Sequence, residues 1–377
     1  MQKLSRNLLF ALIAFYSVLF VVRAVVRGDD FVVFYNVAKG FWSGVSPYSV
    51  EQYGNMVFKY PPWYLTAFLP FSLLPKVAAQ VLWGLLEALG LCFTVHCLRK
   101  KFKIDDGVLL LVFLLSAGLM INQARAAQLS ILFLAAAFLS KQSYKSWLFT
   151  TFLFSSKLLT LFPFLGESLS RGFFKKSSVL ALVFVVFSLP VLIVIYDGDG
   201  AMLVHDWLKA MFDSGSMAKQ GVGVVSFVSR EAQGFPSLVL RLFDLNESFY
   251  PVIFSILASF AFLVAFGFLI SKKLNPDDHW WVWLSLTPLL QPLAWFHFFL
   301  LVIPFVSFQL NRYWQKKHKF DFCMFTALFL LVTVVSEKTM GQFGHNLEML
   351  SIKSWGVLLM LLYAVIRWEG KIEQKRA

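Results

Sequence analysis

The chain alternates between long apolar runs and short polar segments over its whole length. The runs that come near the ~20 residues needed to cross the hydrocarbon layer of a bilayer are 107–121, 178–195, 252–271, 321–335 and 354–366. The first run, 8–22, follows only two basic residues and has no small-residue cleavage site. It therefore predicts a retained signal-anchor helix and not a cleaved signal peptide.

Other apolar runs are too short to cross a membrane alone, and several are paired around a Pro, Lys or Gln. They are 63–75, 146–156, 158–169, 280–292 and 294–308. Interrupted backbone at membrane depth survives only where protein or water satisfies it, so these pairs predict half-helices that meet at a cavity.

The number of crossings is open at one place. The stretch 63–98 is long enough for two helices, but a path from Asp30 on one side to Arg99 on the other needs an odd number. The length rule gives about ten to twelve membrane passes in all. We expect an all-α polytopic membrane protein with a single integral membrane domain, 1–377.

Composition supports this class of protein. Hydrophobic residues make up 58% of the chain and charged residues only 15%, and the mean hydropathy is +0.69, which is far more apolar than a soluble domain. The net charge of +13 lies in short segments between apolar runs and forms no basic face or arm. It therefore does not indicate a nucleic-acid partner.

The distribution of charge predicts the topology. By the positive-inside rule, we expect the cytoplasm to face the N-terminus, the tail 367–377, and the basic segments near Arg99, Lys141, Arg171, Lys272 and Arg312. The first outer loop, 27–62, carries an Asp-Asp motif, and the large outer loop is 196–248. Segments 122–128 and 337–353 complete the outer side. A bacterial inner (plasma) membrane fits this arrangement.

The three cysteines, Cys92, Cys97 and Cys323, lie inside apolar runs without metal-ligand spacing. An odd number cannot form a complete disulfide framework. We interpret them as core filler and expect no metal site.

Asp29 and Asp30 follow the first apolar helix directly, in a chain that otherwise avoids charge. An aspartate at the water face of a membrane cavity can take a proton from a substrate hydroxyl. Alternatively, the two acids cap the helix that begins at Phe31, a role worth ~1 kcal/mol.

Three N-terminal motifs occur in order: Asp30-Phe31-x-x-Phe34-Tyr35, Gly44-x-Ser46-Pro47-Tyr48, and Phe58-x-Tyr60-Pro61-Pro62 with a later Leu73-Leu74-Pro75. Together they resemble the N-terminal signature of glycosyltransferase family 87. The resemblance implies a GT-C fold whose outer loops carry the site. It also implies transfer of a sugar, mannose in the known cases, from a polyprenyl-phosphate carrier to a lipid or glycan acceptor at the outer face.

Weaker echoes of the family continue to about position 310. Ala127-Gln128 stands where the family has Gly-Gln, and Lys157 stands where a helix breaks at Lys-Pro. Further on are Lys219-Gln220-Gly221 with Arg230, and then Trp295-Phe296-His297. The chain departs from the family at Ala127, Leu158 and Lys219.

These residues suggest roles in an inverting transfer. We expect Asp30 to be the base and Asp29 to orient it. The leaving phosphate needs cations, for which we expect Lys157, Arg230 and Arg125. The sugar and the acceptor are assigned to Tyr35, Tyr60, Gln128, Gln220 and His297. No metal or other cofactor is expected.

Each assignment has a structural alternative. Lys157 can snorkel to the surface, Arg125 can be an ordinary loop arginine, and His297 can be a hydrogen-bonded structural residue. Gln128 and Gln220 can satisfy backbone at a broken helix, and tyrosines commonly line membrane interfaces. A secondary transporter or a flippase of a lipid-linked or anionic substrate is the alternative function, and a scaffold ranks below it.

Overall fold

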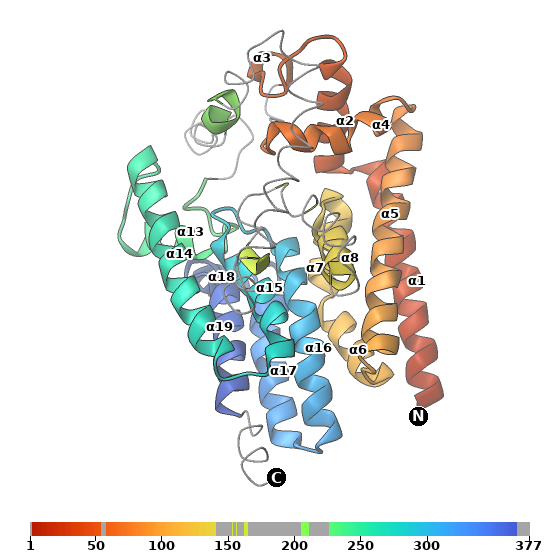
Figure 1. Cartoon of the computed structure of the whole chain (residues 1–377), viewed down its shortest axis with the longest axis vertical. Coiled ribbons are helices and arrows are strands. Elements are labelled where there is room, and N and C mark those ends of the chain that lie inside the picture. Colours follow the sequence, from red (N-terminus) through yellow and green to blue (C-terminus); the bar gives the residue numbers. More distant parts are fainter. Residues whose placement is uncertain are drawn as a thin grey trace.

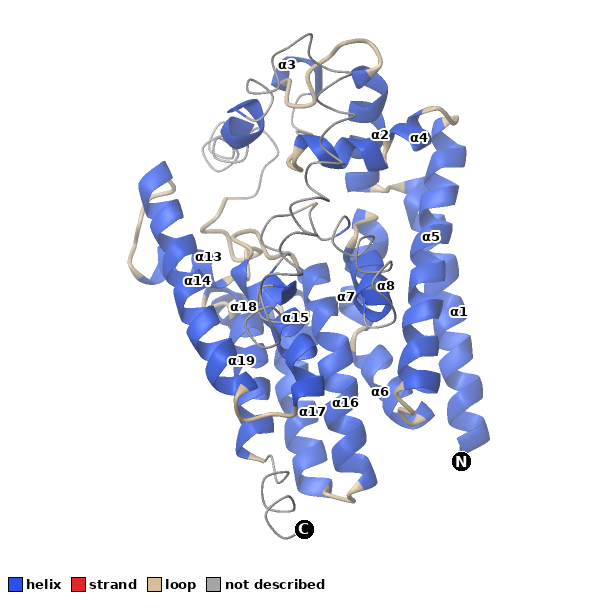
Figure 2. Ribbon diagram, viewed as in Figure 1, coloured by secondary structure: helices blue, strands red, loops and turns tan. Residues whose placement is uncertain are grey.

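The structure of the protein, a computed structural model, describes residues 2–53, 58–140, 153, 156, 162–164, 205–210 and 226–367. Every regular element within these residues is a helix (Figure 2). Three helices are long and apolar enough to cross a membrane, or up to five if each of two bent pairs counts as one crossing. The predicted spans and half-helices between 146 and 195 lie almost wholly outside the described residues.

One group of helices comes from the N-terminal part of the chain. α1 (Gln2–Val26) packs against α5 (Lys76–His96), α6 (Asp106–Leu115) and α7 (Ala117–Ala126), and α5 packs against α8 (Ser130–Ser140). Gly84 allows α1 and α5 to approach closely, because a Cβ atom there would lie 2.6 Å from the Cα atom of Val21.

A second group comes from the C-terminal part. It contains α13 (Phe235–Leu242), α14 (Phe249–Ser271), α15 (His279–Leu290), α16 (Ile303–Gln315), α17 (Lys319–Thr333), α18 (Glu337–Met349) and α19 (Ile352–Ile366). α15 lies at its centre, since Trp280, Trp281 and Trp283 are each at most 2% exposed. The 3₁₀ helix η5 (Phe296–Val302) packs against α7 and α8, and one hydrophobic core therefore runs through both groups.

One run predicted as a single span is bent, because α6 and α7, which cover 107–121, meet at 61°. The run 321–335 matches one helix, α17, and the 91° bend to α18 follows its end. The half-helix prediction for 280–292 and 294–308 agrees with the structure, because α15 ends at Leu290 and η5 begins at Phe296. The backbone of this break is satisfied by protein: Gln233 N–H donates to the Ala294 carbonyl (3.2 Å), and Ser237 donates to the Pro292 carbonyl.

The structure shows how many long helices the stretch 63–98 contains. η1 (Pro62–Ala67) and α4 (Leu69–Ser72) stay at the end of the molecule that holds α2 (Asp29–Phe41) and α3 (Val50–Tyr53), as Figure 1 shows. Only α5, continued by the π-helical turn η2 (Cys97–Lys101), runs to the other end. One helix within this stretch therefore runs from one end of the molecule to the other, which matches the odd number expected.

The elements separate the polar segments into two ends. The start of α1 and the end of α19 lie at one end, and α2 lies at the other (Figure 1). Segments expected outside contact one another: Asp29 pairs with Arg125, Arg230 pairs with Glu337, and the Trp207 indole donates to the Lys59 carbonyl. This grouping agrees with the charge pattern, and the compartment that each end faces stays a prediction.

The interpretation of all three cysteines as core filler is wrong for two of them. Cys97 is buried, but Cys92 and Cys323 are exposed on α5 and α17. The outward face of a membrane helix is apolar as well, so an apolar run alone does not separate buried positions from lipid-facing ones.

Gly28 makes the turn between α1 and α2. Its backbone is left-handed (φ 52°, ψ 41°), and a Cβ atom there would lie 2.5 Å from the Ala24 carbonyl oxygen. Only glycine adopts this conformation without strain. The turn directs Asp29 and Asp30 away from the end of α1.

We expect Gly28→Ala to lower the free energy of unfolding by about 2 to 4 kcal/mol, because it adds a steric clash to the cost of a left-handed backbone. Gly44→Ala is the matched control: Gly44 has φ 75° but no atom within 4 Å of the added Cβ. Thermal unfolding in detergent measures both variants. Equal destabilisation would show that the contact with Ala24 has no consequence.

Candidate active site

The Asp-Asp motif forms the first turn of α2. The position before the helix is Gly28, and no side chain caps the helix. The capping alternative for Asp29 and Asp30 is therefore wrong. Both acids still lie where the helix dipole favours negative charge, by about 0.3 to 1 kcal/mol each.

The turn that carries these acids is tied to α5. The buried amide of Gln80 donates to the carbonyls of Ala24 (2.8 Å) and Val25 (3.4 Å). These carbonyls belong to the last turn of α1, where the C=O groups of a helix have no hydrogen-bond donors within the helix. Gln80 thus holds the end of α1 against α5.

Gln128 joins two segments of the family-like motif. Its side-chain N–H donates to Asp30 Oδ2, and its Oε1 accepts a hydrogen bond from the Tyr60 hydroxyl (2.9 Å). Gln128 is 8% exposed and Tyr60 is 5% exposed, so few other orientations of the amide are open to it. Three residues predicted for the site, Asp30, Tyr60 and Gln128, therefore lie together.

Trp83 on α5 contacts the residues next to both Asp30 and Gln128. Its indole N–H donates to the Ala127 carbonyl (3.0 Å), and its ring stacks on Phe31 with centroids 5.0 Å apart. Ala127 has a left-handed backbone (φ 51°) and ends α7. One side chain thus holds the neighbours of both Asp30 and Gln128.

Three cations lie close to the two acids. Asp29 pairs with Arg27 (3.4 Å) and with Arg125 (3.6 Å). Both pairs are partly exposed, so each contributes little to stability. The predicted Arg125 is thus adjacent to the Asp-Asp motif, and it is free to exchange its partner for a ligand anion.

Lys59 is the third cation, and the sequence analysis missed it. Burial lowers the pKa of Lys59 to about 8, and the negative charge of Asp30 partly opposes that shift. Lys59 occupies the variable position of the Phe58-x-Tyr60 motif. Its position between two motif residues was the signal that could have identified it.

A buried carboxyl group lies behind Gln128. The amide of Gln123 donates both to the Gln128 backbone carbonyl and to Glu87 Oε1, and Glu87 and Gln123 are fully buried. Glu87 was also missed by the sequence analysis. The available signal was an acid in the middle of an apolar helix, which usually marks a functional site.

Tyr35, assigned to sugar or acceptor binding, has a different contact. It is buried, and its hydroxyl donates to the Leu74 carbonyl (2.9 Å). This bond ties α2 to the segment after α4. No described contact joins the Tyr35 hydroxyl to Asp30.

Arg230 and His297 lie on two other segments of the chain. Arg230 forms an ion pair with Glu337 and a hydrogen bond with His345 Nδ1 (2.9 Å). His297 is buried in η5, which packs against the helices on either side of Gln128. The contacts given for the described residues do not bring either side chain to Asp30. Lys157 and Gln220 lie outside the described residues.

No group of three or more His, Cys, Asp or Glu side chains within the described residues could hold a metal ion. In comparisons with protein-family models, curated proteins and solved structures, nothing matches this chain.

We expect Gln128→Leu to reduce the free energy of unfolding by about 2 to 4 kcal/mol, because it removes the partners of Asp30 and Tyr60. The control is Gln342→Leu, at an exposed amide that bonds only Asn346. Thermal unfolding of both variants in the same detergent tests the contact. A loss no larger at Gln128 than at Gln342 would mean that the bridge contributes nothing.

Proposed function

We propose that this chain is a membrane glycosyltransferase that moves a sugar, mannose in the simplest case, from a polyprenyl-phosphate carrier to an acceptor hydroxyl. The observation that carries the proposal is the contact between Gln128 and Asp30. It joins two segments of a family-like pattern that are 98 residues apart. A GT-C-like bundle of about ten to twelve helices, with this end facing outward, is part of the same proposal.

In the proposed reaction, the acceptor oxygen attacks the anomeric carbon of the sugar. The bond from that carbon to the phosphate oxygen breaks, and the phosphate leaves with the electron pair. Asp30 takes the proton of the acceptor hydroxyl. One carboxylate is sufficient for an inverting transfer of this kind.

The amide of Gln128 supports Asp30 in this role. It donates to Oδ2 of the carboxylate. Because Tyr60 holds the other end of the amide, the carboxylate is oriented before substrate binds. Such preorganisation contributes to catalysis since it costs no rearrangement during the reaction.

The leaving phosphate is assigned to Lys59 and Arg125. Arg125 pairs with Asp29, and the charge of Asp30 acts on Lys59; a phosphate oxygen accepts charge-assisted hydrogen bonds from such groups. Lys157 remains a candidate for the same role. Arg230 already pairs with Glu337, so it would have to exchange partners. The proposed reaction needs no metal, because side chains neutralise the phosphate.

The transporter alternative depended on broken helices that expose backbone to a substrate or ion. At the break 291–295, Gln233 and Ser237 occupy the Ala294 and Pro292 carbonyls. This arrangement gives the alternative less support than the charged groups around Asp30 give the transferase.

Asp30→Asn removes the proposed base but keeps the size of the side chain, so we expect transfer to fall by ~100-fold or more. Asp29→Asn is the matched control, because Asp29 faces Arg27 and Arg125, and we expect a change of less than ~10-fold. Release of polyprenyl phosphate by the purified protein measures both. Full activity of Asp30→Asn would exclude Asp30 as the base.

The pKa of Lys59, about 8, predicts a pH dependence. The ammonium is charged below this pH and loses its charge as the pH rises through it, so transfer should decline above pH ~8. Lys59→Arg keeps its charge to much higher pH and should move the decline upward. Lys39→Arg, at an exposed position of α2, should leave the profile unchanged. A decline that stays in place in Lys59→Arg would remove Lys59 from the proposal.

A further inference from the structure

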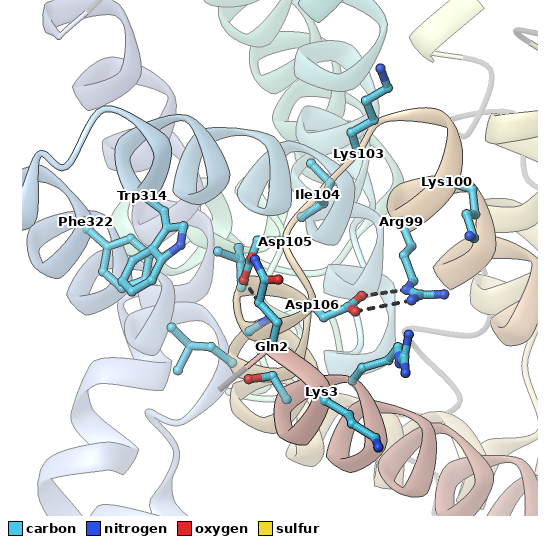
Figure 3. Close-up of a pocket in the computed structure, with 15 residues that line it drawn as sticks. Gln2, Lys3, Arg99, Lys100, Lys103, Ile104, Asp105, Asp106, Trp314 and Phe322 are labelled. Carbon is cyan, nitrogen blue, oxygen red and sulfur yellow. Dashed lines mark hydrogen bonds and ion pairs between the residues drawn. The ribbon is translucent and has the colours of Figure 1, made fainter.

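A cavity of about 910 Å³ lies at the end of the molecule opposite the Asp-Asp motif. The start of α1, the connection from η2 to α6, and side chains of α16 and α17 line it (Figure 3). It therefore lies where the N-terminal and C-terminal groups of helices meet. Its basic residues are Lys3, Arg6, Arg99, Lys100 and Lys103.

The two acids of the cavity already have partners. Asp106 forms an ion pair with Arg99 (2.6 Å), drawn in Figure 3, and Asp105 caps α6 by accepting the Gly107 N–H (2.8 Å). Within the described part of the chain, no acid pairs with the remaining cations, Lys3, Arg6, Lys100 and Lys103. The cavity thus offers uncompensated positive charge.

Apart from Gln2, Ser5 and Gly107, the other lining residues are apolar. Ile104 and Val108 are buried, Leu111 is half-buried, and Trp314 and Phe322 form an aromatic side. Indole rings favour the boundary between headgroups and hydrocarbon. A basic opening next to an apolar wall matches a molecule that has an anionic head and a hydrocarbon tail.

We propose that this cavity binds the phosphate headgroup of an anionic membrane lipid. The phosphate lies among Lys3, Arg6, Lys100 and Lys103, and the first part of an acyl chain lies against Val108 and Leu111. Anionic lipids are attracted to clusters of basic residues at a membrane surface. This site is separate from the proposed transferase site and does not depend on it.

A lipid at this position would contact both groups of helices at once. Lys3 and Arg6 belong to α1, and Trp314 and Phe322 belong to α16 and α17. A ligand that binds the folded protein and not the unfolded chain raises the unfolding temperature. The proposal therefore predicts lipid-dependent stability.

The test uses the full-length protein in detergent, with phosphatidylglycerol, phosphatidylcholine or inorganic phosphate added separately. Phosphatidylglycerol should raise the unfolding temperature by roughly 3 to 6 °C, and the other two should raise it by less than ~1 °C. Equal shifts with the two lipids would overturn the proposal. If inorganic phosphate alone gave the full rise in unfolding temperature, the cavity would be a site for a soluble anion and not for a lipid.

Two variants that remove the same amount of charge test whether the lipid binds in the cavity. The combined variant Lys3→Gln, Arg6→Gln and Lys103→Gln should lose the shift. The control, Lys273→Gln, Lys317→Gln and Lys319→Gln, removes the same charge from exposed positions outside the cavity and should keep it. Retention of phosphatidylglycerol in native mass spectra gives a second readout. If the cavity variant fails to fold, Lys103→Gln alone should weaken retention, and unchanged retention would exclude the site.

Discussion

The side-chain amide of Gln128 is the contact on which the proposed site depends. It holds Asp30 with its N–H and receives the Tyr60 hydroxyl with its oxygen, so three distant segments of the chain share one group. Different residues position the segments that carry these partners. Gly28 turns the chain into α2, and Trp83 anchors both Phe31 and Ala127. A proposed base that is fixed in this way needs little reorganisation when substrate arrives.

Several buried polar groups are paired within the protein, as helices that are long and apolar enough to cross a membrane require. Backbone and side chains inside a bilayer have no water to bind, and an unsatisfied group costs several kcal/mol. Glu87 is therefore bound by Gln123, and the broken backbone at 291–295 is bound by Gln233 and Ser237. Lys353 likewise donates to the carbonyls of Val332 and Val335 near the bend that precedes α18.

The sequence predicted the helical class, and it singled out Asp30, Tyr60 and Gln128, which the structure brings together, because they belong to short motifs with strong residue preferences. It did not predict Glu87 or Lys59. Their roles depend on partners from other segments, Gln123 and Asp30, and no local pattern identifies such partners. The capping interpretation failed because Gly28 adopts a left-handed conformation that places both acids inside the helix.

The 61° bend between α6 and α7 was not predictable for a related reason. It lies within a continuous apolar run, and packing against neighbouring helices decides where such a run changes direction. The cysteines show the same limit, since lipid-facing and buried positions are equally apolar. Arg230 and His297 were also named from the sequence; in the structure Arg230 contacts Glu337 and His345, and His297 is buried in η5.

The most direct test of the proposed site is an electron cryomicroscopy structure of the protein in a lipid nanodisc with added polyprenyl phosphate. The account predicts density for the phosphate beside Lys59 and Arg125, within reach of Asp30, with the polyprenyl chain running into the surrounding lipid. Phosphate density only at the opposite end, in the cavity lined by Lys3 and Lys103, would contradict the assignment of the transferase site to Asp30.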